Sequence, residues 1–198
     1  MSDSARIKLR MITAAAYDLH VEQLFEKLKR LHSALDAASI PYRLVGGVAV
    51  FLQVNERDPE KARMTRDVDV AVERGQLARI AAAAEKYGFR YRHAAGLDML
   101  VDASEPRARS VIHLIFVREK VRPDYLEPVP DFSEPTRTAE GILIAPVADL
   151  VRMKLTSFRL KDQVHIQDMD SVGLITPEIE ASLSQPLRFR LGQVRAAE

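Results

Sequence analysis

The segment 67–73 (DVDVAVE) constrains the fold most, because a valine stands at every second position and both aspartates lie between valines or before one. A period of two predicts a β-strand with its three valines facing a core and its other side chains on the opposite face. Two carboxylates, those of Asp67 and Asp69, fall on that opposite face. Residues two apart on a strand are about 6.6 Å apart and point the same way. The pattern therefore predicts a strand that presents paired carboxylates at one point.

The rest of the chain predicts an α+β fold, a mixed sheet flanked by helices with a C-terminal helical portion. The segment 48–54 is expected to be a short buried helix, although its valines and phenylalanine also allow a strand. The polar segment 55–64 and the four-proline segment 121–135 are expected to be irregular. Other helices are expected over 19–38, 76–87, 146–160 and 162–171, with a last short helix that starts at 176. Strands are expected over 42–45, 89–93, 98–101, 110–117 and 143–144. Residues 1–198 are expected to form one domain, in which 146–198 is a possible helical subdomain.

Composition excludes several classes of site. The chain has no cysteine, which excludes disulfides, thiol catalysis and zinc sites built on thiolates. Its formal net charge of +1 argues neither for nor against a nucleic-acid partner. No apolar run approaches the roughly 20 residues of a membrane span, and the N-terminus lacks the apolar core of a signal peptide. We therefore expect a cytoplasmic protein with no membrane partner.

Two adjacent glycines, Gly46 and Gly47, interrupt the apolar segment between the expected strand 42–45 and the expected helix 48–54. Glycine lets the backbone turn sharply and approach a ligand closely, and amide groups at a helix start bind phosphate. The spacing is not a dinucleotide-binding GxGxxG pattern, because no third glycine follows. Alone, the pair indicates a tight turn as readily as a phosphate site.

Paired carboxylates on a strand suit a hard divalent cation. Magnesium prefers oxygen ligands and is commonly held by one or two carboxylates together with substrate phosphates and water. A metal would also offset the repulsion between the neighbouring charges of Asp67 and Asp69. The alternative is a pair of solvated carboxylates on an edge strand, which need no metal.

Together, the motifs LVGGVAV (44–50) and TRDVDV (65–70) resemble the DNA polymerase beta-like nucleotidyltransferase superfamily. In detail they are most similar to the AbiEii-type family, the nucleotidyltransferase toxins of type IV toxin–antitoxin systems. The segments DLVRMKL (149–155) and RLKDQVHIQDM (159–169) are similar to that family's C-terminal helices. The resemblance spans roughly residues 40 to 175.

The resemblance implies that Gly46 and Gly47 cradle a triphosphate and that Asp67 and Asp69 hold Mg²⁺. It also implies that Lys154 contacts phosphate or the acceptor, although spacing alone fits a solvated lysine equally well.

The third carboxylate of the superfamily has no evident counterpart, because His113 occupies its position on the strand 110–117. Imidazole is a poor magnesium ligand, but its pKa suits a general base. A purely structural histidine is the alternative, with Glu73, Asp98 or Asp102 supplying the missing carboxylate.

The expected function is a magnesium-dependent transfer of a nucleoside monophosphate from NTP to a hydroxyl acceptor. RNA, a protein side chain and a small molecule are all open as the acceptor. A toxin of this kind implies an antitoxin protein as partner. The alternative is a catalytically impaired member of the fold that binds nucleotide or protein.

Overall fold

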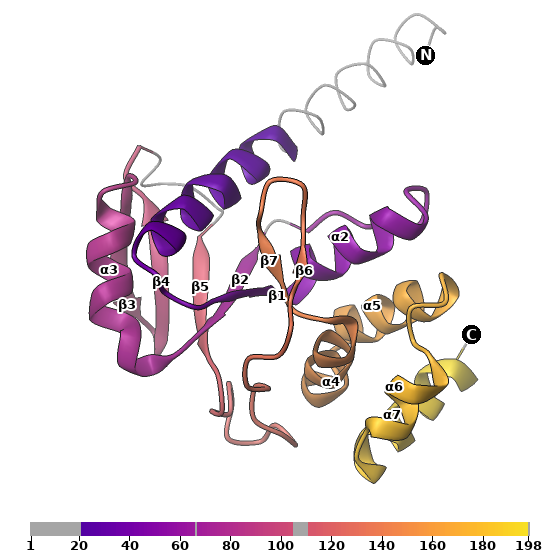
Figure 1. The fold of residues 1–198 in the computed structure, drawn as a ribbon. Helices are drawn as coiled ribbons and strands as arrows, with labels where there is room; N and C mark the ends of the chain where they lie inside the picture. Colours follow the sequence, from indigo (N-terminus) through magenta and orange to yellow (C-terminus); the bar gives the residue numbers. More distant parts are fainter. Residues whose placement is uncertain (1–20, 66, 105–110, 198) are drawn as a thin grey trace, which may run out of the picture.

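The sheet is built around β2 (Val68–Val72), the strand in which the sequence alternates. The computed structural model describes residues 21–65, 67–104 and 111–197. In it, β2 pairs antiparallel with β1 (Arg43–Val45) and parallel with β5 (Ile112–Phe116). The seven-stranded sheet has the order β3-β4-β5-β2-β1-β7-β6 (Figure 1). The outer strands are β3 (Phe89–Ala94), β4 (Leu97–Asp102), β6 (Thr136–Arg137) and β7 (Leu143–Ile144). The expected mixed sheet is confirmed.

Helices pack on the sheet and on one another. The N-terminal helix is described over 21–37, and the others are α2 (Gly46–Arg57), α3 (Leu77–Glu85), α4 (Val147–Ser157), α5 (Leu160–Ser171), α6 (Pro177–Ser182) and α7 (Gln185–Ala196). A 3₁₀ turn, η1 (Arg74–Gln76), precedes α3. Helix α2 packs on β1 and β2, α4 and α5 pack on α2, and α7 packs on α4 and α5. The C-terminal helices thus lie at the end of the molecule opposite α3 (Figure 1).

The N-terminal helix is amphipathic, as its sequence predicts. Its leucines at positions 24, 28, 31 and 35 are all buried in the main core. Burying a leucine contributes roughly 1.5–3 kcal/mol, so this stripe fixes the helix on the sheet. On the same helix, Arg30 lies over the ring of Phe89 and pairs with Asp102, which ties the helix to β3 and β4.

Helix α2 differs from its expected bounds. It begins at Gly46, so both glycines lie in its first turn, and it continues through residues 55–57, which were expected to be irregular. The strand alternative for 48–54 is wrong. Valine and phenylalanine are poor helix formers, but Val48, Val50 and Phe51 are buried, and burial outweighs intrinsic propensity here.

The segment 118–135 contains no helix or strand, as four prolines predict. The helix expected from Pro146 to about 160 ends earlier, because Phe158 adopts a left-handed conformation with φ of 50°. The expected start at Thr176 is confirmed, since its hydroxyl accepts a hydrogen bond from the amide of Ile179. Strand β6 and helix α7 were not expected.

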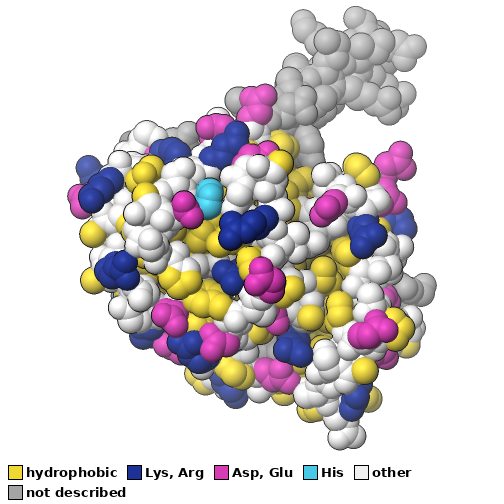
Figure 2. All heavy atoms as spheres, viewed as in Figure 1, with side chains coloured by type: hydrophobic (Ala, Val, Ile, Leu, Met, Phe, Trp, Pro, Cys, Tyr) yellow, Lys and Arg dark blue, Asp and Glu magenta, His cyan; other side chains and the backbone are white. Residues whose placement is uncertain are grey.

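The described surface mixes charges of both signs. On the face in Figure 2, basic and acidic side chains are interspersed among apolar ones. Within the described ranges, no helix is long and apolar enough to cross a membrane.

Candidate functional site

Sheet register places Asp69 beside the start of α2. In the antiparallel β1–β2 pair, Asp69 lies opposite Val45, the last residue of β1 and the residue that precedes α2. The turn from strand to helix and the carboxylate strand are therefore neighbours, although 22 residues lie between Gly46 and Asp69 in the sequence. The fold thus brings together two motifs that lie apart in the sequence.

The carboxylate of Asp69 lies so close to the backbone of residue 46 that only glycine fits at this position. Its φ is +73°, a conformation that side-chain-bearing residues rarely adopt. A Cβ at this position would overlap Oδ2 of Asp69 and lie 2.9 Å from its Cγ. A Cβ on Gly47 would lie 2.6 Å from Cγ2 of Thr65. The glycine pair thus lets the first turn of α2 contact both the carboxylate and the segment that leads into β2.

The side chain of His113 contacts Asp69 from the other neighbouring strand. The two residues are paired in the parallel β2–β5 register, and Nδ1 of His113 is 3.2 Å from Oδ1 of Asp69. The hydrogen bond to Asp69 raises the pKa of His113 above its ordinary value, against the opposing effect of burial. The charge of Asp67 acts in the same direction.

Each of the three carboxylates considered as a replacement is engaged elsewhere. Glu73 pairs with Arg118 at the far end of β2, four residues and about 13 Å along the strand from Asp69. Asp98 is paired with Leu114 rather than with His113 in the sheet register, and Tyr91 and His93 of β3 bind its carboxylate. Asp102 is held by Arg30 and Ser104. His113 therefore keeps the position beside Asp69.

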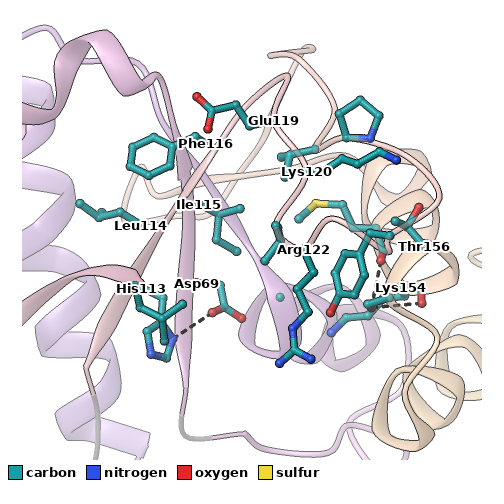
Figure 3. Close-up of a pocket in the computed structure, with 18 of the residues that line it drawn as sticks. Asp69, His113, Leu114, Ile115, Phe116, Glu119, Lys120, Arg122, Lys154 and Thr156 are labelled. Carbon is teal, nitrogen blue, oxygen red and sulfur yellow. Dashed lines mark hydrogen bonds and ion pairs between the residues drawn. The ribbon is translucent and has the colours of Figure 1, made fainter. Parts of the chain in front are cut away.

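A pocket of about 330 Å³ opens over this arrangement. Gly46, Asp67, Asp69 and His113 line it, together with basic side chains from α4, α5 and the segment 118–135. Figure 3 shows Asp69 and His113 joined at its floor, with Lys154 on the wall formed by α4. The structure thus brings five of the six sequence-predicted site residues to one cavity. The sixth, Gly47, is buried directly behind Gly46.

Lys154 is not a solvated lysine. It is 5% exposed, and its ammonium donates a 3.0 Å hydrogen bond to the fully buried Asp162. The same carboxylate accepts from Ser157 at 2.8 Å and from Nε of Arg159 at 2.6 Å. Burial opposes ionisation of Asp162, but these donors and the charge of Lys154 hold its pKa well below its usual range. Burial lowers the pKa of Lys154, and the charge of Asp162 opposes that effect.

The pair His165 and Asp168, spaced three apart on α5, does not form a metal site. The carboxylate of Asp168 pairs with Arg63 at 3.0 Å. Nδ1 of His165 is buried without a hydrogen-bond partner among the described residues, and burial lowers the pKa of the imidazole to about 4.

The donor set at the floor of the pocket fits magnesium rather than a softer metal. Asp67 and Asp69 offer only oxygen atoms, and magnesium is commonly held by two carboxylates plus phosphate and water. Within the described ranges, no group of three or more histidine and acidic side chains forms a complete protein metal cage. The two aspartates would therefore need substrate oxygens to complete the coordination of a metal.

Sequence reasoning missed the contribution of the segment 118–135. Arg122 and Tyr125 from this segment line the pocket. The available signal was the tetrapeptide RPDY (122–125), because proline at the second position favours a β-turn. The prolines of the segment predict irregular structure, but that expectation does not place the segment at the pocket.

The sequence matches no protein-family model and no curated protein. Solved structures that are similar in fold include two of the antibiotic-resistance factor ANT(2'')-Ia. The solution structure of the antibiotic-resistance factor ANT(2'')-Ia has 13% identity and a TM-score of 0.48, with 85% of this chain and 86% of that chain covered. A crystal structure of ANT(2'')-Ia in complex with adenylyl-2''-tobramycin has 13% identity and a TM-score of 0.41, with 85% and 94% covered. At these values the comparison assigns no role to any residue.

Proposed function

We propose that this chain is a nucleotidyltransferase that moves a nucleoside monophosphate from an NTP to a hydroxyl acceptor. The observation that carries the proposal is the contact between Asp69 and Gly46, which joins a carboxylate pair to a glycine helix start at the floor of a pocket. Carboxylates that can hold a metal and backbone amides that can bind phosphate are the two halves of a phosphate-transfer site. The similarity of the two motifs to nucleotidyltransferases supports the same assignment.

In the proposed reaction, an oxygen of the acceptor hydroxyl bonds to the α-phosphorus, the bond from that phosphorus to the β-phosphate oxygen breaks, and pyrophosphate leaves. The amides at Gly46 and Gly47 bind phosphate oxygens. Asp67 and Asp69 would hold Mg²⁺, which supplies positive charge next to the phosphates when bound. His113 donates through Nδ1 to Asp69, and its Nε2 accepts the proton of the acceptor hydroxyl.

The direct test is transfer of label from an NTP carrying radioactive α-phosphate. We expect Asp67→Asn and Asp69→Asn to reduce transfer at least 100-fold, because each removes one of two charges at the metal position. Asp36→Asn is the matched control, since Asp36 is exposed on the N-terminal helix. Removal of magnesium with a chelator should abolish transfer by the unaltered protein. Equal transfer by the control and both site variants would contradict the mechanism.

A second candidate function is nucleotide binding without transfer. The observation that favours it is His113, which stands beside Asp69 where a third carboxylate is expected in the superfamily. Calorimetry that detects NTP binding, together with no label transfer to any acceptor, would support this alternative. Restoration of transfer by His113→Asp would identify the missing carboxylate as its cause.

The AbiEii-type assignment and a toxin role rest on the motif resemblance alone and belong to the proposal. A cytoplasmic location fits the same proposal, because NTP and Mg²⁺ are abundant there. Expression in a bacterial host should arrest growth, and co-expression of a cognate antitoxin should restore it. Growth that is unaffected by expression of the chain would count against a toxin.

RNA, protein and small-molecule fractions should each be screened as acceptors.

A further inference from the structure

The basic side chains that line the pocket fall into two groups. In the first, each cation is paired with a carboxylate. Arg74 makes two hydrogen bonds to Glu119, at 2.7 and 2.5 Å, and Asp162 holds both Lys154 and Arg159. These charges are largely compensated before any ligand arrives.

The second group comprises Lys120, Arg122 and Lys161, for which the described part of the chain contains no ion pair. Lys161 lies close enough to His113 for its charge to oppose protonation of the imidazole. Lys120 and Arg122 come from the segment 118–135. The uncompensated positive charge of the pocket therefore comes from residues outside both sequence motifs.

Arg122 differs from Lys120 in where its side chain points. In Figure 3, Arg122 descends from the segment above the pocket, and its guanidinium reaches the level of Asp69 and Lys154. Lys120 points away from Asp69 along the upper rim. Of the two, only Arg122 is directed toward the carboxylate floor.

The backbone that carries Arg122 is fixed by a turn. Residues 122–125 form a β-turn, closed by a 3.1 Å hydrogen bond from the amide of Tyr125 to the carbonyl of Arg122. Proline at the second position fixes its own φ and restricts the residue before it to extended geometry. The first and fourth residues of a β-turn lie within 7 Å of each other. The turn therefore keeps the backbones of Arg122 and Tyr125 close together, and both residues line the pocket.

The base of the segment is fastened to the sheet. Arg118 pairs with Glu73, which directly follows β2, and with Asp131. The amide of Val129 donates to the carbonyl of Glu119 at 2.9 Å, and the side chain of Val129 is buried in the core. These contacts join both ends of the loop 119–128, so the turn at its tip is held at the pocket rather than left as a free excursion.

We propose that the turn 122–125 is a nucleotide-binding element. This inference rests on the proposed function and adds residues that the motifs did not identify. Arg122 binds phosphate oxygens of the NTP through its guanidinium, which can donate two parallel hydrogen bonds to one phosphate. Tyr125 packs its ring against the nucleoside. Lys154, held by Asp162, shapes the wall and is not the main phosphate ligand.

The test is calorimetric binding of MgATP, MgGTP, MgCTP and MgUTP, and of the matching monophosphates, to the full chain. For the triphosphate that binds best, we expect Arg122→Ala to weaken binding about tenfold or more, since a hydrogen bond to a charged group is lost. The loss should be smaller for the monophosphate. Arg122→Lys should restore part of the affinity, because it keeps the charge but not the planar fork. Tyr125→Ala should weaken both nucleotides alike, and Tyr125→Phe should not.

Arg188→Ala is the matched control. Arg188 is exposed on α7, so this substitution removes the same charge outside the pocket. Thermal melting of each variant checks that folding is retained. Unaltered NTP affinity in Arg122→Ala, or an equal loss in Arg188→Ala, would overturn the inference while leaving the proposed function intact. If the unaltered protein binds none of the four triphosphates, the proposed function fails and this inference fails with it.

Discussion

At Gly46, two independent constraints exclude a side chain. The positive φ costs an alanine roughly 1–2 kcal/mol, and a Cβ would overlap the carboxylate of Asp69. We expect Gly46→Ala to destabilise the fold by at least about 1–2 kcal/mol in urea unfolding. Nucleotide transfer should fall further than this loss explains, because Asp69 is displaced from the site even in folded molecules.

Gly192 on α7 provides the control for that substitution. A Cβ there would meet no atom within 4 Å, and the residue lies inside a helix. Gly192→Ala should therefore leave transfer unchanged and raise stability by roughly 0.5–1 kcal/mol. Gly46→Ala with wild-type stability and activity would contradict the geometry of the site.

A substitution at Lys154 distinguishes a structural role, in which it stabilises the buried Asp162, from a role in binding phosphate. Lys154→Met leaves the buried Asp162 with Arg159 and Ser157 as partners but without its ammonium, so we expect a loss of about 3 kcal/mol in stability. The double variant Lys154→Met/Asp162→Asn should recover part of this loss, because the buried charge is removed as well. If Lys154→Met instead keeps full stability and abolishes NTP binding, the phosphate role implied by the family resemblance is correct.

At the scale of elements, α5 carries a source of acid sensitivity. Burial, and then the charge of Lys154, lower the pKa of His165 from 6.5 to about 4 in the folded chain. Between these values the unfolded chain binds a proton that the folded chain does not, so stability falls as the pH falls from 6.5 towards 4 and levels off below that. Urea unfolding at several pH values should show a shallower decline for His165→Gln. Identical pH profiles would show that His165 is not responsible.

The elements that the sequence predicted correctly are those whose signal is local. Strand β2 follows from the valines at every second position, and the start of α6 follows from the capping hydroxyl of Thr176 before a proline. Helix α7 buries Leu187, Leu191 and Val194 at helical spacing. Many arginines in that segment obscured this short apolar stripe. Strand β6 has two residues and owes its existence to pairing with β7, which no local pattern shows.

The candidate site was predictable in its parts but not in its assembly. The two motifs supplied Gly46, Asp67 and Asp69 from local chemistry, and the position of His113 came from the strand expected around it. The partners of Lys154 and the approach of Arg122 depend on contacts between distant segments. Sheet order and loop closure decide those contacts, so a reading of single segments could not reveal them.

At the scale of the whole molecule, the C-terminal helices are joined to the sheet through the same region that forms the site. Strand β7 pairs parallel with β1, and the amide of Ala145 donates to the carbonyl of Leu44 at 3.0 Å. Helix α4 follows at once and buries Leu150 and Leu155 completely. Because α2 packs on both the sheet and α4, the pocket wall and its floor share one core.

This shared core leads us to propose that residues 1–198 unfold as one unit and that 146–198 is not an independent subdomain. Urea unfolding followed by far-ultraviolet circular dichroism and by amide hydrogen exchange in β2 and α5 should give coincident midpoints. A chain truncated after residue 145 should fail to fold, because it exposes the apolar face of α2 that α4 and α5 cover. A separate early transition confined to α4–α7, or a folded truncated chain, would establish the helical portion as a subdomain and place the wall of the pocket on a movable part.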